Sequence, residues 1–153
     1  DRIFETKNIK IQEDTQKILG SIINTFTVVI DAGVPENEII HYDVGTKLGK
    51  KLEPLFKSTE YNDIFYELAG FWKKNGFGHV DELEITPNST TFNVYDCFEC
   101  SHMPNMGRTV CKLDEGFLTT VLETKFKSKF EVKELECYAS GFDHCRFQIT
   151  NKK

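Results

Sequence analysis

The chain has 153 residues, which suits one domain of ordinary size, and its 39% hydrophobic content with 13 phenylalanines can fill a sizeable core. A net charge of −5, with acids and bases interleaved, argues against a nucleic-acid backbone as partner, and no apolar run approaches the roughly 20 residues of a membrane span. Five cysteines are an odd number for a disulfide framework, so we expect free thiols and a cytoplasmic location. Residues 1–153 are expected to form a single domain, with 1–13 as an N-terminal arm.

Two helices are predicted near the start of the chain. The first covers residues 15–32, and its apolar face is broad enough to contact a partner subunit, so a symmetric homodimer is expected. The second covers residues 35–52. Gly45 and Gly49 lie four positions apart on it, which favours close packing against a neighbouring helix. A phosphate-binding loop is the weaker alternative because no strand precedes these glycines.

A third helix, capped by Ser58 or Thr59 and ending near residue 75, carries an aromatic stripe that indicates a core face or the wall of a ligand pocket. Two strands follow, over residues 77–86 and 90–100. On such a strand Cys97 and Cys100 would point to opposite faces. Their C-x-x-C spacing is therefore interpreted as two ordinary thiols, and the alternatives are a zinc knuckle and a redox pair.

The last third of the chain predicts one more helix over 111–126 and two strands over 130–139 and 145–149. The expected order of elements is ααα-ββ-α-ββ. Helices and hairpins that segregate in this way indicate an α+β fold, an antiparallel sheet with helices packed on it.

Three cysteines surround the last helix and hairpin, at positions 111, 137 and 145. Zinc takes four tetrahedral ligands from thiolate, imidazole and carboxylate groups, so a zinc ion could clip this helix to the hairpin. Buried free thiols are the alternative interpretation. Four nearby side chains could supply the fourth ligand: Glu134, Glu136, His144 and His102.

Residues 137–147, which read CYASGFDHCRF, resemble the closing signature of the 4-vinyl reductase domain family, and residues 110–117 resemble its preceding cysteine and Gly-Phe helix. Related sensor domains of phenol-responsive transcription activators bind structural zinc through three cysteines and one glutamate. The resemblance places these ligands on Cys111, Glu134, Cys137 and Cys145. Glu134 and Cys137 differ in parity on a regular strand, so their joint ligation needs a bulge or a strand end, with Glu136 as the fallback.

The resemblance also implies a fold shared with the ligand-binding domains of nitric-oxide signalling and Golgi-transport proteins. It implies an apolar or aromatic ligand, such as a hydrocarbon, held between helices and sheet, and a signal passed to a downstream protein partner. The aromatic residues expected to bind that ligand are Phe65, Trp72, Phe92, Tyr95, Phe98 and Phe117.

Enzymatic activity is the less favoured function. The sequence shows no nucleophile elbow, no HExxH and no dinucleotide fingerprint, so no catalytic residue is assigned. The alternatives to a sensor or carrier are an accessory or substrate-carrier component of tetrapyrrole vinyl reduction and a structural dimer module without a ligand. A closed zinc site with four protein ligands would have a structural role in each case.

Overall fold

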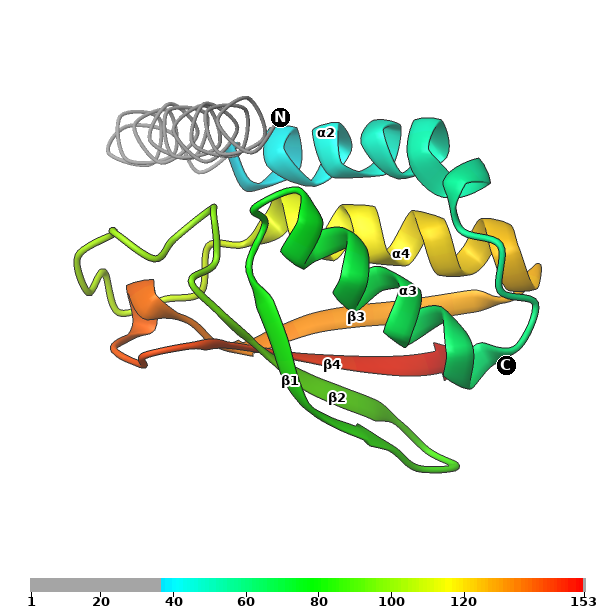
Figure 1. Cartoon of the computed structure of the whole chain (residues 1–153). Coiled ribbons are helices and arrows are strands. Elements are labelled where there is room, and N and C mark those ends of the chain that lie inside the picture. Colours follow the sequence, from blue (N-terminus) through cyan, green and yellow to red (C-terminus); the bar gives the residue numbers. More distant parts are fainter. Residues whose placement is uncertain (1–36, 153) are drawn as a thin grey trace, which may run out of the picture.

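The computed structural model of the protein describes residues 37–152 (Figure 1). Within this range three α-helices and four β-strands follow one another in the order αα-ββ-α-ββ. The α+β class and the antiparallel sheet are confirmed. The helix predicted over 15–32, the arm at 1–13 and the dimer contact assigned to that helix lie outside the described residues.

The sheet has the strand order β1-β2-β4-β3, and all neighbouring strands are antiparallel. In the centre of the sheet, Phe92 pairs with Phe147 and Val94 with Cys145. Buried and exposed residues alternate along β3 and β4, as expected for a sheet with one covered face. The strands are β1 (His79–Ile85), β2 (Thr90–Tyr95), β3 (Lys129–Glu136) and β4 (Cys145–Lys152).

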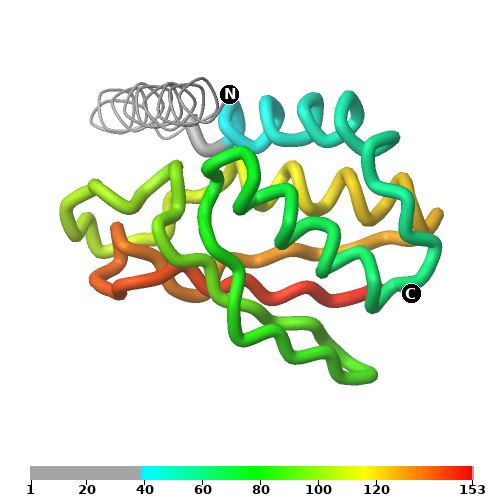
Figure 2. The backbone as a smooth tube through the Cα atoms, in the orientation of Figure 1, coloured from blue at the N-terminus to red at the C-terminus, as the bar shows by residue number. Residues whose placement is uncertain are grey.

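Helices α3 (Tyr61–Lys74) and α4 (Lys112–Phe126) lie against the same face of the sheet, and α2 (Asn37–Leu52) lies on the far side of α4 (Figures 1 and 2). α4 is consequently buried on most of its circumference, because it separates the sheet from α2. α3 buries one stripe at helical spacing, namely Ile64, Phe65, Leu68 and Trp72. None of the described helices combines the length and the apolar character that crossing a membrane requires.

The predicted close packing at Gly45 and Gly49 is confirmed. A Cβ atom added to Gly45 would lie 2.1 Å from the carbonyl oxygen of Leu113, and one added to Gly49 would lie 3.0 Å from that of Phe117. Gly116 on α4 makes the reciprocal contact, since its added Cβ would lie 2.2 Å from the carbonyl oxygen of Tyr42. The backbones of α2 and α4 therefore touch where both helices lack side chains.

Several predicted boundaries are wrong for local reasons. The N-cap of α3 is Glu60, and neither Ser58 nor Thr59 fills this position. The pairing of β1 shifts between Asp81 and Glu84, which explains the irregular alternation of its sequence. β4 continues to Lys152.

The two predicted strands that carry cysteines also end early. β2 stops at Tyr95, because Asp96 has a φ of 52° and starts a turn where a strand was predicted up to residue 100. β3 stops at Glu136, and the short 3-10 helix η2 (Tyr138–Ser140) takes the place of its predicted end. Both early ends move cysteines out of the sheet.

Candidate functional site

The ends of three elements bring the predicted zinc ligands together. Cys111 is the N-cap residue of α4, and Cys145 begins β4. Glu134 lies near the end of β3, where the pairing with β4 shifts between Glu134 and Glu136. Cys137 follows directly after the strand. The irregularity at this strand end lets Glu134 and Cys137 face the same point, which a regular strand would prevent.

The geometry of this cluster fits a metal ion. A tetrahedral zinc ion with zinc–sulfur bonds of about 2.3 Å separates its sulfurs by about 3.8 Å. The Sγ atom of Cys111 lies 3.9 Å from that of Cys137 and 3.7 Å from that of Cys145. The backbone N–H of Cys111 donates to Glu134 Oε2 at 2.9 Å, whereas the buried Oε1 atom has no hydrogen-bond partner within residues 37–152. An orphaned carboxylate oxygen beside three thiols is what a bound cation would satisfy.

The structure adds Cys100 to the cluster, which sequence reasoning missed. The Sγ atom of Cys100 lies 3.1 Å from that of Cys145 and 3.3 Å from that of Cys111. Ligand atoms of Cys100, Glu134 and the three predicted cysteines all lie within 4.8 Å of one another, and all five residues are buried. The prediction that Cys97 and Cys100 point to opposite faces of a strand is wrong, because both residues follow the end of β2.

Cys97 lies at the side of the cluster. Its Sγ atom is 3.8 Å from that of Cys111 and 3.7 Å from Asp114 Oδ2. The remaining candidates for the fourth ligand lie elsewhere, since His144 Nε2 pairs with the Glu136 carboxylate and His102 is exposed. The C-x-x-C spacing was the signal in the sequence for both missed thiols.

The electrostatics of the cluster favour a cation. Burial and the nearby Cys137 thiolate raise the pKa of Glu134 to about 10. Hydrogen bonds from neighbouring thiols, first of all Cys100, lower the pKa of Cys137 well below its usual range. Burial also raises the pKa of Glu99 and Asp114. Many acidic groups thus share one buried volume, and a divalent cation would offset their mutual repulsion.

Three of the six predicted ligand-binding residues, Phe65, Trp72 and Phe92, do surround a cavity, but its volume is only about 10 Å³. This space accommodates about one water molecule. The Nε1 atom of Trp72 is buried and has no hydrogen-bond partner in the described part of the chain. Side-chain packing has therefore nearly closed the interior between α3 and β2.

The other three predicted residues lie outside that cavity. The Phe117 ring packs edge-on against Trp72 at 5.2 Å, and the Phe98 ring stacks on Phe77 at 4.6 Å. The Tyr95 hydroxyl donates to Glu82 Oε1 at 2.8 Å. The structure does not bring these three residues together with the walls of the cavity.

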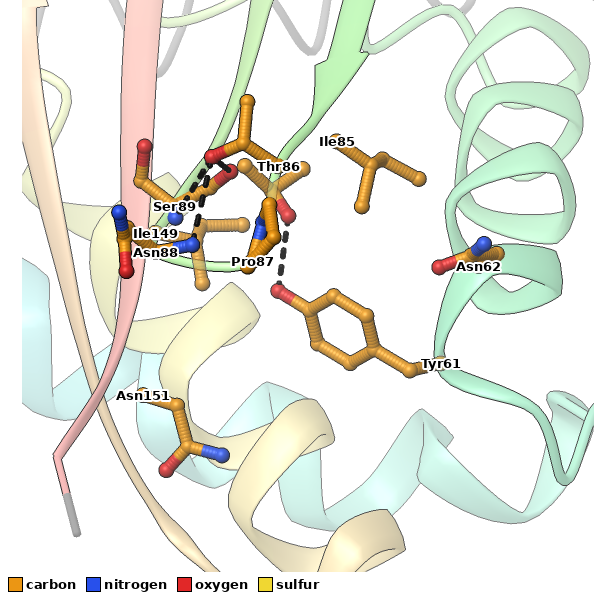
Figure 3. A pocket seen from close by; sticks show the side chains of 10 residues that line it. Tyr61, Asn62, Ile85, Thr86, Pro87, Asn88, Ser89, Ile149 and Asn151 are labelled. Carbon is orange, nitrogen blue, oxygen red and sulfur yellow. Dashed lines mark hydrogen bonds between the residues drawn. The ribbon is translucent and has the colours of Figure 1, made fainter.

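An open groove of about 470 Å³ lies between the start of α3, the β1–β2 turn and the end of β4 (Figure 3). The Tyr61 hydroxyl reaches across to the hydroxyl of Thr90 at 2.9 Å (Figure 3). The Tyr61 ring also stacks on Phe130 at 6.0 Å and meets Phe65 edge-on at 5.1 Å, so it separates the groove from the aromatic core. The groove is lined by Tyr61, Asn62, Ile85, Thr86, Pro87, Asn88, Ser89, Thr90, Ile149 and Asn151.

Comparison with known proteins gives the fold and the family. Three solved structures share the fold of this chain. The phenol-responsive sensory domain of the transcription activator PoxR with phenol is 17% identical, with a TM-score of 0.64 over 89% of this chain and 74% of that one. A trafficking protein particle complex subunit 3 from Naegleria fowleri, covalently bound to palmitic acid, is 13% identical, with a TM-score of 0.73 over 93% and 98%. A vinyl-4-reductase family protein from Methanocaldococcus jannaschii is 20% identical, with a TM-score of 0.59 over 89% and 80%.

The sequence relatives are uncharacterized proteins of Methanocaldococcus jannaschii. MJ1642 is 31% identical over 121 residues, which cover 77% of this chain and 69% of that protein. MJ0150 is 26% identical over 112 residues, and the chain spans only 64% of its length. Residues 90–151, which contain both halves of the C-terminal motif, match the model of the 4-vinyl reductase domain. The chain belongs to the 4-vinyl reductase domain family, which its last forty residues resemble.

Proposed function

We propose that the protein is a small-molecule-binding domain, a sensor or carrier, whose buried cysteine cluster holds a structural zinc ion. The observation that carries this proposal is the groove of about 470 Å³. Its volume falls in the range of about 300–1,000 Å³ that is typical of small-molecule sites. By contrast, the aromatic cavity of about 10 Å³ is too small for any organic ligand unless the core opens.

The groove has an apolar floor and a polar rim. Ile85, Pro87 and Ile149 supply apolar surface, and the amides of Asn62 and Asn88 supply hydrogen-bonding groups. Such a mixture fits an aromatic or hydrocarbon molecule with one polar group. The phenol bound by the PoxR domain and the palmitic acid bound by the trafficking subunit have this character, which supports the proposal for a domain of the same fold.

The zinc ion would act on the shape of the domain. With Cys111, Glu134, Cys137 and Cys145 as ligands the site is closed, so it leaves no open position for a substrate. It would tie the start of α4 to the β3–β4 hairpin. Ile149 lies four residues beyond Cys145 along β4, a distance of about 13 Å at the rise of an extended strand, so the metal would not contact a ligand in the groove.

A ligand panel with a matched pair of variants tests the proposal. Phenols, fatty acids and hydrocarbons with one polar group are scored by the shift in melting temperature, because a ligand of the native state stabilises it by mass action. Asn62→Phe narrows the groove, and Asp63→Phe places the same ring on the neighbouring exposed position outside it. We expect a compound that raises the melting temperature of the wild type and of Asp63→Phe, with a smaller shift for Asn62→Phe.

A panel in which no compound shifts the melting temperature would contradict the binding function. The nearly filled aromatic core would then favour a structural module without a ligand. A compound that stabilises both variants equally would show that binding takes place outside the groove.

A further inference from the structure

The cysteine cluster has one donor more than a tetrahedral metal ion needs. Five side chains place a ligand atom within 4.8 Å of one another, namely Cys100, Cys111, Glu134, Cys137 and Cys145. Zinc in a structural site takes four. The three cysteines of the C-terminal motif are common to every arrangement, so Cys100 and Glu134 compete for the fourth position.

The backbone holds Cys100 in place for this role. The N–H of Ser101 donates to the carbonyl oxygen of Cys97 at 2.9 Å, and the N–H of Met103 donates to that of Cys100 at 2.9 Å. The Cys100 side chain is fully buried and its Sγ atom lies 3.1 Å from that of Cys145. Four thiolates at such distances repel one another strongly unless a cation lies between them. A metal ion would draw each sulfur to a bond length of about 2.3 Å and widen the closest pairs to about 3.8 Å.

Glu134 is the weaker competitor. One of its oxygens already accepts the N–H of Cys111 at 2.9 Å, a bond that fixes the start of α4. Its backbone N–H donates to Glu115 Oε1 at 2.9 Å, so the strand end is anchored without any metal. A carboxylate is also a harder ligand than a thiolate and is less suited to an ion that already has three sulfur ligands.

We propose that Cys100 is the fourth ligand, so that the metal is bound by the four thiolates of Cys100, Cys111, Cys137 and Cys145. Glu134 then lies next to the metal without ligating it, and its Oε1 atom can replace a lost thiolate. This inference rests on the metal centre proposed above and changes its composition. A four-thiolate site selects zinc or another thiophilic ion and excludes magnesium and calcium.

Cobalt substitution of the full chain tests the ligand set, because thiolate-to-cobalt charge transfer reports the number of bound thiolates. We compare the wild type with Cys100→Ser, Glu134→Gln and Cys97→Ser, the last as a matched control from the same C-x-x-C pair. Cys100→Ser should lower the charge-transfer absorbance by about a quarter, the share of one thiolate in four, and shift the d–d bands. Glu134→Gln and Cys97→Ser should leave the spectrum unchanged.

The opposite pattern, with Glu134→Gln shifting the bands and Cys100→Ser leaving them unchanged, would overturn the proposal in favour of a carboxylate ligand. Shifts in both variants would indicate a five-coordinate ion and would overturn it as well. If Cys100→Ser does not fold, X-ray absorption of the zinc-loaded wild type decides. Four sulfurs at about 2.3 Å support the proposal, and three sulfurs with one oxygen at about 2.0 Å contradict it. A wild type that binds neither metal would instead refute the metal centre itself.

Discussion

Replacing Gly45 with alanine should destabilise the domain, although alanine is the better helix former. The added Cβ would lie 2.1 Å from the carbonyl oxygen of Leu113 and 2.9 Å from the backbone nitrogen of Phe117. Both contacts are with backbone atoms, so rotation of a side chain cannot relieve them. α2 and α4 would have to separate by about 1 Å to restore an ordinary contact distance of about 3.5 Å.

The expected loss follows from two opposing terms. Exchanging glycine for alanine inside a helix gains about 1 kcal/mol from backbone entropy. Overpacking of a tight interface costs about 1–3 kcal/mol and sometimes more, and a backbone clash belongs at the upper end of that range. The free energy of unfolding should therefore fall by about 1–2 kcal/mol in Gly45→Ala.

Urea unfolding measures this change through the fluorescence of Trp72, which is the single tryptophan and is buried. Gly70 provides the control, because it lies inside α3 and a Cβ added there would meet no atom of the described residues within 4 Å. Gly70→Ala should raise the free energy of unfolding by up to about 1 kcal/mol. If Gly45→Ala were as stable as Gly70→Ala, the direct backbone contact between α2 and α4 would be refuted.

Three further predictions concern acid stability, the groove and the metal. Burial alone would raise the pKa of Glu67, but hydrogen bonds from Ser58 and Lys57 outweigh it and lower that pKa. The stabilisation by Glu67 is therefore complete above its ordinary pKa of 4.5 and lost as pH falls through the lowered value, so Glu67→Gln should lose stability at pH 7 and match the wild type at pH 2 in urea unfolding. Tyr61→Phe removes the hydrogen bond to Thr90 and should cost about 1 kcal/mol in the same assay, and an unchanged midpoint would show that this bond contributes nothing. A strong chelator should lower the melting temperature of the wild type, since metal-binding free energy becomes folding free energy, and restored zinc should reverse the loss.

Local sequence patterns predicted the helices and the close packing at Gly45 and Gly49, because helical periodicity and missing side chains act over one or two turns. They also predicted that Cys111, Cys137 and Cys145 come together, since the resemblance of the C-terminal motif fixed their spacing. The structure agrees in that it brings the sulfurs of Cys137 and Cys145 within 3.9 Å of that of Cys111.

The position of Cys100 could not be predicted from the same patterns. It depends on the end of β2 at Asp96, which adopts a positive φ of 52° although it is not a glycine. The alternation of residues before Asp96 gives no sign of that turn. Only the C-x-x-C spacing pointed to a shared site, and the expected strand argued against it.

The location of the groove was equally hidden. Tyr61, the turn at residues 86–89 and Ile149 are far apart in the sequence and meet only when the sheet and α3 pack together. The volume of an interior cavity likewise depends on how side chains fill the space, so the aromatic residues of α3 and β2 predicted a pocket that packing reduces to about 10 Å³.

The metal centre is tested most directly by native mass spectrometry of the purified full chain. The 17.7 kDa protein should carry about one zinc ion per chain, as a single tetrahedral site requires. Cys111→Ser, Cys137→Ser and Cys145→Ser should each lose the ion and melt at a lower temperature, and Cys97→Ser should retain it. A wild-type chain without metal in zinc-containing medium, or three variants that keep the ion at full occupancy, would show that the cluster consists of ordinary buried thiols.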